Sequence, residues 1–377
     1  KLIGIVSYAD ILNGYPLVPI DEERYGELGS RLEIGFDFNG HGSHVAGTVA
    51  GNILKNVPAY NAEGKESNFA FEQISGMAPH ANIVSYQVCY PGNSDDYLAG
   101  CLPELTLQAV EHAIANGVSV LNYSVGGSAT DPWYGFESQA FLNARTFGVH
   151  VATSAGNSGP DSGTIGTPAN LPWVTTVAAF THDRTFAEKQ ISFTGGSFSL
   201  SPLVGRSASG GLTAEIVDAA DFGDGDCLTE FAAGTFNGEI VVCRRGEIAR
   251  VAKGSNVKAG GAGGLVLINV DGGSETVDND FHVLPSIHLD ATQGQSLVNW
   301  LAEGSNHIAV IEEGEMVSDP DAGSIAGYFS SRGPGLPYDS YLSLDIAAPG
   351  VSIYAPFTEN QPFSNTKSKA KFAFLDG

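Results

Sequence analysis

Between residues 81 and 153 the chain alternates apolar runs of strand length with amphipathic helical segments, and this pattern constrains the fold most. The predicted strands, 81–88, 118–125 and 149–153, are almost continuously apolar. Helices are predicted between them, over 105–116 and 137–147. Apolar strands separated by helices indicate a parallel sheet with a helical layer on each face. We therefore predict an α/β fold with a three-layer parallel sheet.

Near residue 190 the character of the sequence changes. Segment 190–318 is rich in Gly, Ser and Thr and contains short β runs, such as 239–243 and 264–268. From about residue 319 the earlier character returns. This indicates a mainly-β domain inserted into one α/β domain. The predicted domains are 1–189, 190–318 and 319–377.

Composition excludes some classes of function. The 377 residues include 42 Asp and Glu against 18 Lys and Arg, a net charge of −24. Nucleic-acid binding needs a basic surface, so no nucleic-acid partner is predicted. No run reaches the roughly 18 apolar residues of a membrane span. The acidity is typical of a solubilising surface, and a halophilic or marine setting is the alternative.

The four cysteines form two local pairs, Cys89/Cys101 and Cys227/Cys243. Four cysteines allow three connectivities, and separations of 12 and 16 residues favour the local one. Each such disulfide would stabilise the fold by about 3 kcal/mol. Disulfides indicate a secreted protein; four reduced, buried thiols are the alternative.

A candidate catalytic histidine opens the segment His41–Asn52, where small apolar residues are predicted to form a tightly packed helix. Glycines at 42, 47 and 51 would each cost a solvated helix about 1 kcal/mol. We therefore expect another element to press against this helix, with the His41 imidazole facing a cleft.

His44 follows His41 at helical spacing, so the two rings share one face. A metal site with Asp37 as a third ligand is one interpretation. No Glu accompanies the pair as it does in a zincin motif. The favoured interpretation is a core histidine that is hydrogen-bonded within the helix packing.

The turn after the third predicted strand carries a candidate hydrogen-bond donor for a negative oxygen. Asn157 follows the small residues Ser154, Ala155 and Gly156. An amide held in such a turn can stabilise a developing oxyanion, which contributes about 10²–10³ in rate. The alternative is an Asn that caps its own turn.

Five motifs in a fixed order together resemble the subtilases, the subtilisin-like serine proteases of peptidase family S8. They are His41–Gly47, Ser124–Gly127, Ser154–Asn157, Phe329–Pro334 and Asp345–Val351. Segment 190–318 is similar to the protease-associated (PA) domain that many secreted subtilases carry. The resemblance implies a subtilisin-like fold with an inserted mainly-β PA domain. It also implies a secreted serine endopeptidase that hydrolyses peptide bonds through a Ser-His-Asp triad and an acyl-enzyme.

The resemblance also assigns roles to individual residues. His41 would be the general base and Asn157 the oxyanion donor. The substrate-binding residues would be the strand end Ser124, Val125, Gly126 and Gly127, the pocket wall Ser154, Ala155 and Gly156, and the pocket floor Gly166. A floor without a side chain implies that large apolar or aromatic groups are accepted. A cis peptide bond is expected before Pro168.

Two members of the family's triad have no counterpart in this sequence. No Asp-[Ser/Thr]-Gly turn occurs before His41, and the fallbacks Asp10 and Asp37 are more typical of exposed turns. The sequence stops at Gly377, where the family continues with Thr-Ser-Met and the nucleophile. We therefore expect an internal piece of a longer protease, inactive alone, with the catalytic serine two residues beyond Gly377.

Two other functions are left open. A degenerate protease could bind proteins or peptides without cleaving them, and a metallohydrolase could use His41 and His44 with zinc. For the protease no cofactor is expected. Many subtilases hold structural calcium, but the sequence assigns no ligand cluster to it. The expected partners are protein or peptide substrates, and the expected location is extracellular.

Overall fold

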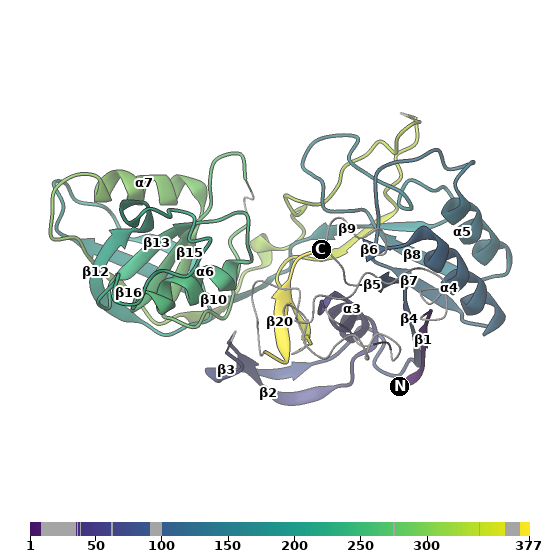
Figure 1. The fold of residues 1–377 in the computed structure, drawn as a ribbon, viewed down its shortest axis with the longest axis horizontal. Coiled ribbons are helices and arrows are strands. Elements are labelled where there is room, and N and C mark those ends of the chain that lie inside the picture. Colours follow the sequence, from purple (N-terminus) through teal and green to yellow (C-terminus); the bar gives the residue numbers. More distant parts are fainter. Residues whose placement is uncertain are drawn as a thin grey trace.

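The structure is a computed structural model, and its described residues form two sheet-based parts (Figure 1). The residues it describes are 1–8, 35, 37, 39–61, 63–90, 100–273, 276–338, 340–358 and 370–377. Residues 184–318, here called the eight-stranded unit, lie on the left of Figure 1. The rest of the described chain, here called the site-bearing part, lies on the right and below.

A four-stranded parallel sheet organises the site-bearing part. Its strands are β7 (Val120–Tyr123), β8 (His150–Ser154), β9 (Thr175–Phe180) and β18 (Ile346–Pro349), in the order β18-β9-β8-β7. Strand β18 pairs with β9 although the whole eight-stranded unit separates them in sequence. The prediction of an α/β fold with a parallel sheet is therefore confirmed.

One strand prediction needs a correction. The run 81–88 does form a strand, β4 (Ile83–Gln87), but it pairs in parallel with β1 (Leu2–Ser7) in a separate two-stranded sheet. Sequence periodicity identifies a strand from its apolar run, whereas the neighbour of that strand depends on long-range packing.

Helices α4 (Pro103–Ala115) and α5 (Phe136–Thr146) cover one face of the four-stranded sheet. Val110 and Phe141 from these helices share a buried cluster with Val151 of β8. Val120 points to the opposite face, because successive side chains alternate, and is 61% exposed. A helical layer over that face, the third layer of the predicted fold, stays a prediction.

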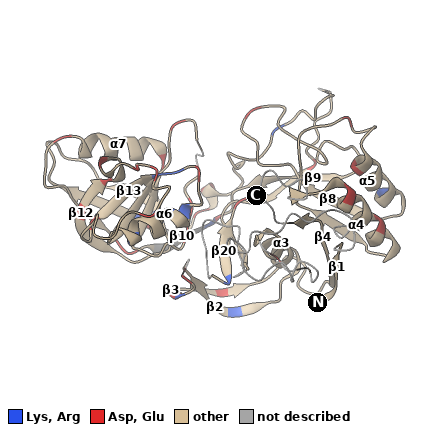
Figure 2. Ribbon diagram, viewed as in Figure 1, with Lys and Arg blue, Asp and Glu red and all other residues tan. Residues whose placement is uncertain are grey.

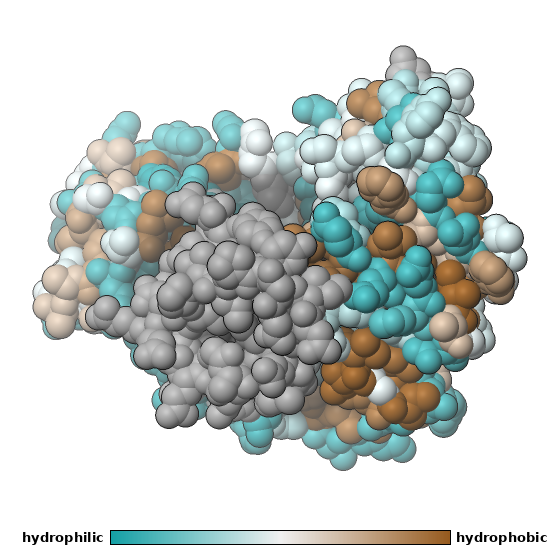
Figure 3. Space-filling model, turned by 45° about the vertical axis from the view of Figure 1, so that its right-hand side comes forward, coloured by the Kyte–Doolittle hydropathy of each residue, from teal (hydrophilic) through white to brown (hydrophobic). Residues whose placement is uncertain are grey.

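Exposed apolar side chains also occur on β1, at Leu2, Ile3 and Ile5. In the space-filling view of Figure 3, hydrophobic side chains gather at the lower right of the face shown.

The eight-stranded unit is a mixed sheet that begins at Arg184, ahead of the predicted boundary at 190. Its order is β11-β15-β14-β13-β12-β16-β10-β17. The strands are β10 (Arg184–Thr194), β11 (Leu203–Arg206), β12 (Leu212–Asp218), β13 (Ile240–Arg244), β14 (Gly264–Ile268), β15 (Ser286–Leu289), β16 (Ile308–Ile311) and β17 (Glu315–Ser318). Neighbours from β12 to β15 are parallel, and the other pairings are antiparallel.

Helices lie on both faces of this sheet. Trp300 of α7 (Ala291–Leu301) packs with Ile240 and neighbouring side chains, and Val257 of α6 (Arg250–Ala259) packs with Val241. Ile240 and Val241 are consecutive residues of β13 and therefore point to opposite faces.

The other described elements connect or flank these sheets. They are α3 (His41–Ala50), the hairpin β2 (Leu54–Tyr60) and β3 (Glu66–Ile74), the short pair β5 (Cys89–Tyr90) and β6 (Gly100–Cys101), the antiparallel pair β19 (Ile353–Pro356) and β20 (Phe372–Leu375), and the 3-10 helices η3 (Ala219–Phe222) and η4 (Pro320–Ala322).

Both predicted disulfides are formed, Cys89–Cys101 across β5 and β6 and Cys227–Cys243 inside the eight-stranded unit. Acidic positions are spread over helices and loops of both parts (Figure 2). None of the helices among the described residues has the length and apolar character needed to cross a bilayer.

Candidate active site

A cavity of about 470 Å³ lies between α3, the carboxyl ends of β7 and β8, and the end of the described chain. Carboxyl ends of parallel strands meet at one edge of a sheet, so the loops after β7 and β8 converge there. Of the sequence-predicted residues, the lining includes His41, Ser124, Gly126, Gly127, Ser154, Ala155, Gly156, Asn157 and Gly166. Val125 lies outside this lining.

His41 is the first residue of α3, and the preceding turn fixes that position. The Asp37 carboxylate accepts hydrogen bonds from the backbone N–H groups of Asn39 (3.0 Å), Gly40 (2.8 Å) and Ser43 (2.7 Å). The Ser43 N–H is one of the groups that a helix start leaves without an intrahelical partner. His41 is exposed and faces the cavity.

The same bonds define the role of Asp37. Burial alone would raise the pKa of Asp37, but the hydrogen bonds from Ser43, Gly40 and Asn39 outweigh it and hold that pKa below its usual value. Asp37 is therefore a half-buried helix cap rather than the exposed turn residue predicted. Asp10 lies outside the described residues.

Close contacts explain two of the three helix glycines. A Cβ on Gly47 would lie 2.3 Å from Pro356 Cδ of β19, and one on Gly51, just after the helix, would lie 2.6 Å from the Gly47 carbonyl oxygen and 3.3 Å from the backbone nitrogen of Gly76. The expected pressing element is thus confirmed. At Gly42 the nearest atom would be Asp37 Oδ2, at 3.6 Å, so this side of the helix is open.

The His44 side chain is buried and hydrogen-bonded. Its Nε2 lies 2.9 Å from the Ile353 carbonyl oxygen and 3.2 Å from that of Ala373, so this nitrogen carries the proton and donates. The side chain is 7% exposed, and burial lowers the pKa of His44. A nitrogen that donates to β19 and β20 does not ligate a metal, which favours the core-histidine interpretation. No group of three or more His, Cys, Asp or Glu able to hold a metal is found in the described part of the chain.

The turn that carries Asn157 is held by the segment 327–331. Gly156 has a φ of 101°, and a Cβ there would lie 2.9 Å from Ser331 Oγ. Ser331 donates its backbone N–H to the Gly156 carbonyl at 2.9 Å, and its hydroxyl accepts the Ser158 N–H at 3.1 Å. This double contact orients the turn, so that Asn157 lies in the cavity wall.

Gly166 lies next to the predicted substrate strand. A Cβ on Gly166 would lie 1.9 Å from the Gly127 carbonyl oxygen, and the Gly127 N–H donates to Thr167 at 2.9 Å. The missing side chain is therefore required by this close approach, and the acceptance of large apolar or aromatic groups stays a prediction. The expected cis peptide bond between Thr167 and Pro168 is present.

Sequence reasoning missed the contribution of the last residues. Leu375, Asp376 and Gly377 line the cavity. The Gly377 N–H donates to the Gly350 carbonyl at 2.8 Å, and a Cβ on Gly377 would lie 3.8 Å from the Asn157 side-chain nitrogen. The motif at 345–351 pointed to this neighbourhood, but the pairing of β20 with β19 that delivers Gly377 has no local signal.

Comparison with known proteins gives a consistent family. The chain matches the model of the subtilase family, Peptidase S8, over residues 29–374. It is 36% identical over 332 residues to subtilisin-like protease SBT5.4 of Arabidopsis thaliana, which covers 86% of this chain and 41% of that protein. It is 33% identical over 354 residues to a CO(2)-response secreted protease of the same plant, covering 88% and 43%.

Among solved structures, an S41 psychrophilic protease is similar, with a TM-score of 0.38 at 16% identity, covering 91% of this chain and 59% of that one. Sphericase is similar with a TM-score of 0.30 at 29% identity, covering 47% and 54%. The chain spans about two-fifths of the length of the plant relatives named above. By its match to the family model and by these plant relatives, the chain belongs to the subtilase family.

Proposed function

We propose that this chain carries the general base and the oxyanion donor of a secreted serine endopeptidase of the subtilisin type. The observation that supports this most is that His41 and Asn157 line one and the same cavity. The triad's Asp and nucleophilic Ser would come from residues outside 1–377, so residues 1–377 alone would be inactive.

In this proposal the serine hydroxyl attacks the peptide carbonyl while His41 removes its proton. The oxygen that becomes negative accepts a hydrogen bond from the Asn157 amide, which is pre-oriented by its turn. His41 then returns the proton to the leaving amine, and an acyl-enzyme remains. Water, activated by the same imidazole, hydrolyses that ester.

The position of Gly377 is consistent with such a nucleophile. Two further residues extend at most about 7 Å, so a serine at the second position beyond Gly377 stays close to the wall that Gly377 shares with Asn157. In this proposal its side chain would enter the cavity that His41 and Asn157 line.

The substrate would bind as an extended strand along Ser124–Gly126. The Gly127 N–H already donates to Thr167, so the pairing would use backbone groups before it. Ser154, Ala155 and Gly156 would wall the primary pocket, which we propose accepts large apolar or aromatic groups. The eight-stranded unit would be the PA domain.

Two observations support extracellular location. Both cysteine pairs form disulfides, which persist in oxidising compartments, and one relative is named as a secreted protease. No cofactor enters the proposed reaction.

A fluorophosphonate probe tests the proposal, because it reacts with activated serines. We expect it to label the longer gene product, and to label neither its His41→Ala variant nor residues 1–377 alone. Absence of labelling in the longer protein, together with peptide binding without cleavage, would instead establish the non-catalytic binding function. Labelling of residues 1–377 would refute the assignment of the nucleophile.

A further inference from the structure

A buried cluster of charges lies where the eight-stranded unit meets the site-bearing part. Arg250, the first residue of α6, has its Nη1 3.1 Å from Asp376 Oδ2 and 3.3 Å from Asp278 Oδ2, and its Nη2 donates to Asp280 at 3.2 Å. Arg245 pairs with Asp278 at 2.9 Å. The Arg250 side chain is 16% exposed and that of Asp376 12%. These ion pairs therefore lie largely out of water, where removing one partner is expensive.

Asp376 connects this cluster to the backbone near the cavity. Its Oδ1 accepts the Ser352 N–H at 2.7 Å, while Oδ2 faces Arg250. The neighbouring Gly377 bonds to Gly350 at 2.8 Å. Asp376 and Gly377 are both part of the cavity lining. One carboxylate thus joins α6 to the two segments that form this wall.

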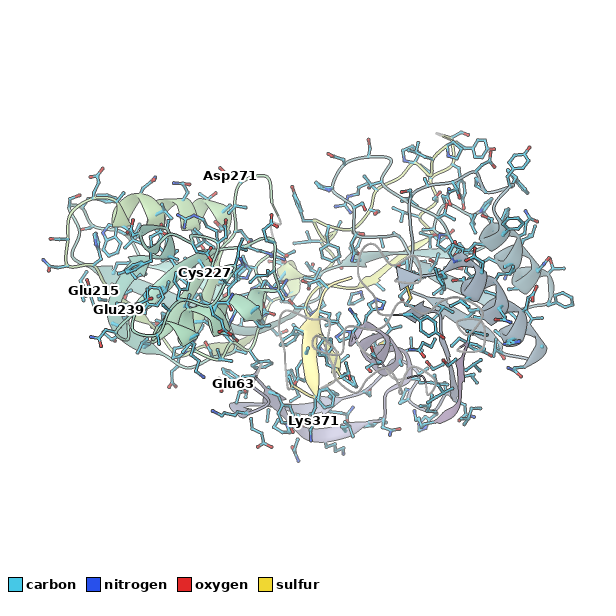
Figure 4. The ribbon with its side chains drawn as sticks, viewed as in Figure 1. Glu63, Glu215, Cys227, Glu239, Asp271 and Lys371 are labelled. Carbon is cyan, nitrogen blue, oxygen red and sulfur yellow. A yellow bond between two sulfur atoms is a disulfide. The ribbon has the colours of Figure 1, made fainter. Side chains whose placement is uncertain are left out.

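A second contact between the parts has a different character. Lys258 of α6 pairs with Glu63 in the turn between β2 and β3, and both side chains are more than a third exposed. Figure 4 shows Glu63 on that hairpin, below the eight-stranded unit. An exposed pair of this kind stabilises weakly, and neither residue lines the cavity.

The composition of the buried cluster does not favour stability. Its five ion-paired side chains carry two positive and three negative charges. Burial and the carboxylates of Asp278 and Asp280 raise the pKa of Asp376 to about 6, although Arg250 opposes that shift. A carboxylate held where its charge is disfavoured, with hydrogen bonds that reach the cavity wall, is typical of a functional site.

We propose that Arg250 is a positioning residue for the active site. By holding Asp376, it fixes the backbone at Ser352 and Gly377, and with them the cavity wall beside Asn157. The eight-stranded unit thereby takes part in the geometry of the site. The catalytic consequence rests on the proposed function, since it assumes that the chain beyond Gly377 carries the nucleophile.

Steady-state kinetics of the longer protein test the catalytic consequence. Arg250→Gln and Asp376→Asn should each lower kcat between about 10-fold and 100-fold with KM nearly unchanged, because a displacement of about 1 Å at the reacting groups has that effect. Arg250→Lys keeps the charge but loses the planar fork, so an intermediate loss is expected.

The matched control is a second buried pair in the same unit. Arg244 donates from Nη1 and Nη2 to the two oxygens of Asp218, at 2.6 and 2.7 Å, remote from the cavity lining. Arg244→Gln should leave kcat within about twofold, even where it lowers the thermal midpoint. Equal losses of kcat in Arg250→Gln and Arg244→Gln would show a merely structural role and overturn the proposal.

Amide hydrogen exchange in residues 1–377 tests the inference without catalysis. In Asp376→Asn and Arg250→Gln the amides of Ser352 and Gly377 should exchange at least about tenfold faster, while those of β13 and β14 keep their protection. Unchanged exchange at Ser352 would refute the positioning role. If the longer wild-type protein is inactive but Ser352 responds, the proposed function fails and the inference stands.

Discussion

The cavity and the eight-stranded unit use opposite means to hold their polar groups. Helix α3 contains no Asp, Glu, Lys or Arg, and His41 and Asn157 are held by backbone contacts, glycines and one capping carboxylate. The eight-stranded unit instead buries charged side chains such as Arg250, Asp278 and Lys189. Burial lowers the pKa of Lys189 to about 8, although its ammonium donates to three carbonyl groups.

The difference indicates that the two regions have different roles. The cavity is lined mostly by small residues, and His41 and Asn157 stay exposed to solvent, as the approach of a substrate would require under the proposed function. In the eight-stranded unit, buried charges make the interior dependent on pH. The two regions should therefore respond to different perturbations. Asp376 contacts both, so a change in the eight-stranded unit can affect the cavity through this residue.

The largest effect is expected at the imidazole. His41→Ala in the longer protein should lower kcat on the order of a million-fold, the magnitude established for subtilisin itself, with the thermal midpoint nearly unchanged because His41 is exposed. Kinetics and calorimetry check this. His80→Ala, at another exposed histidine, is the control and should leave kcat and the thermal midpoint unchanged. A parallel loss of stability and activity in His41→Ala would erase the proposed contrast between the regions.

Acid should unfold the eight-stranded unit first. Burial lowers the pKa of His282 to about 4 and that of His288 to about 3, so the unfolded state binds these protons first as the pH falls below about 6.5. Each neutral histidine therefore contributes stability above that pH, on the order of 3–5 kcal/mol, which is lost as the pH falls towards 3. Asp376 acts in the opposite sense: its stabilising contribution decreases as the pH rises from 3.8 to about 6.

Denaturant unfolding of residues 1–377 between pH 7 and pH 4 measures this dependence. His288→Gln should flatten it, whereas His80→Gln at an exposed site should leave it unchanged. If the free energy of unfolding does not decrease as the pH is lowered from 6.5, the buried histidines are protonated in the folded unit.

The oxyanion donor gives the next largest effect. Asn157→Ala in the longer protein should reduce kcat about 10²–10³-fold, or about 2.7–4 kcal/mol, with little change in KM; this magnitude is again the one known for subtilisin. Asn170→Ala is an informative comparison, because the Asn170 amide bonds to the Thr130 and Leu336 carbonyls and is buried. It should lower stability more than kcat. A raised KM in Asn157→Ala would instead indicate a role in ground-state binding.

The smallest effect concerns the disulfide in the eight-stranded unit. Replacing Cys227 and Cys243 by Ser should lower stability by about 3 kcal/mol, because the bridge closes a 16-residue separation and both residues are fully buried. Activity of the longer protein at 25 °C should stay within about twofold of wild type. A large loss of kcat at an unchanged thermal midpoint would mean that the interior of this unit affects the cavity by a route other than Arg250.

Local patterns accounted for much of the molecule. The parallel sheet, the helix starting at His41, both disulfides and the presence of a mainly-β segment follow from periodicity, glycine placement and cysteine spacing. The role of Asp37 was missed, because nothing in the residues around 37 indicates that its carboxylate caps α3. Strand β10 spans the predicted boundary at 190, so the change in composition there falls inside one strand.

By itself, the sequence determined the residue types that can perform the chemistry and the elements that carry them, since apolar period and turn residues act over a few positions. Only the tertiary structure decided which of these residues share a cavity, why Gly166 has no side chain, and how Arg250 reaches Asp376. Those outcomes depend on contacts between residues more than a hundred positions apart in some cases, and such contacts arise when packed layers bring distant segments together, which no local pattern encodes.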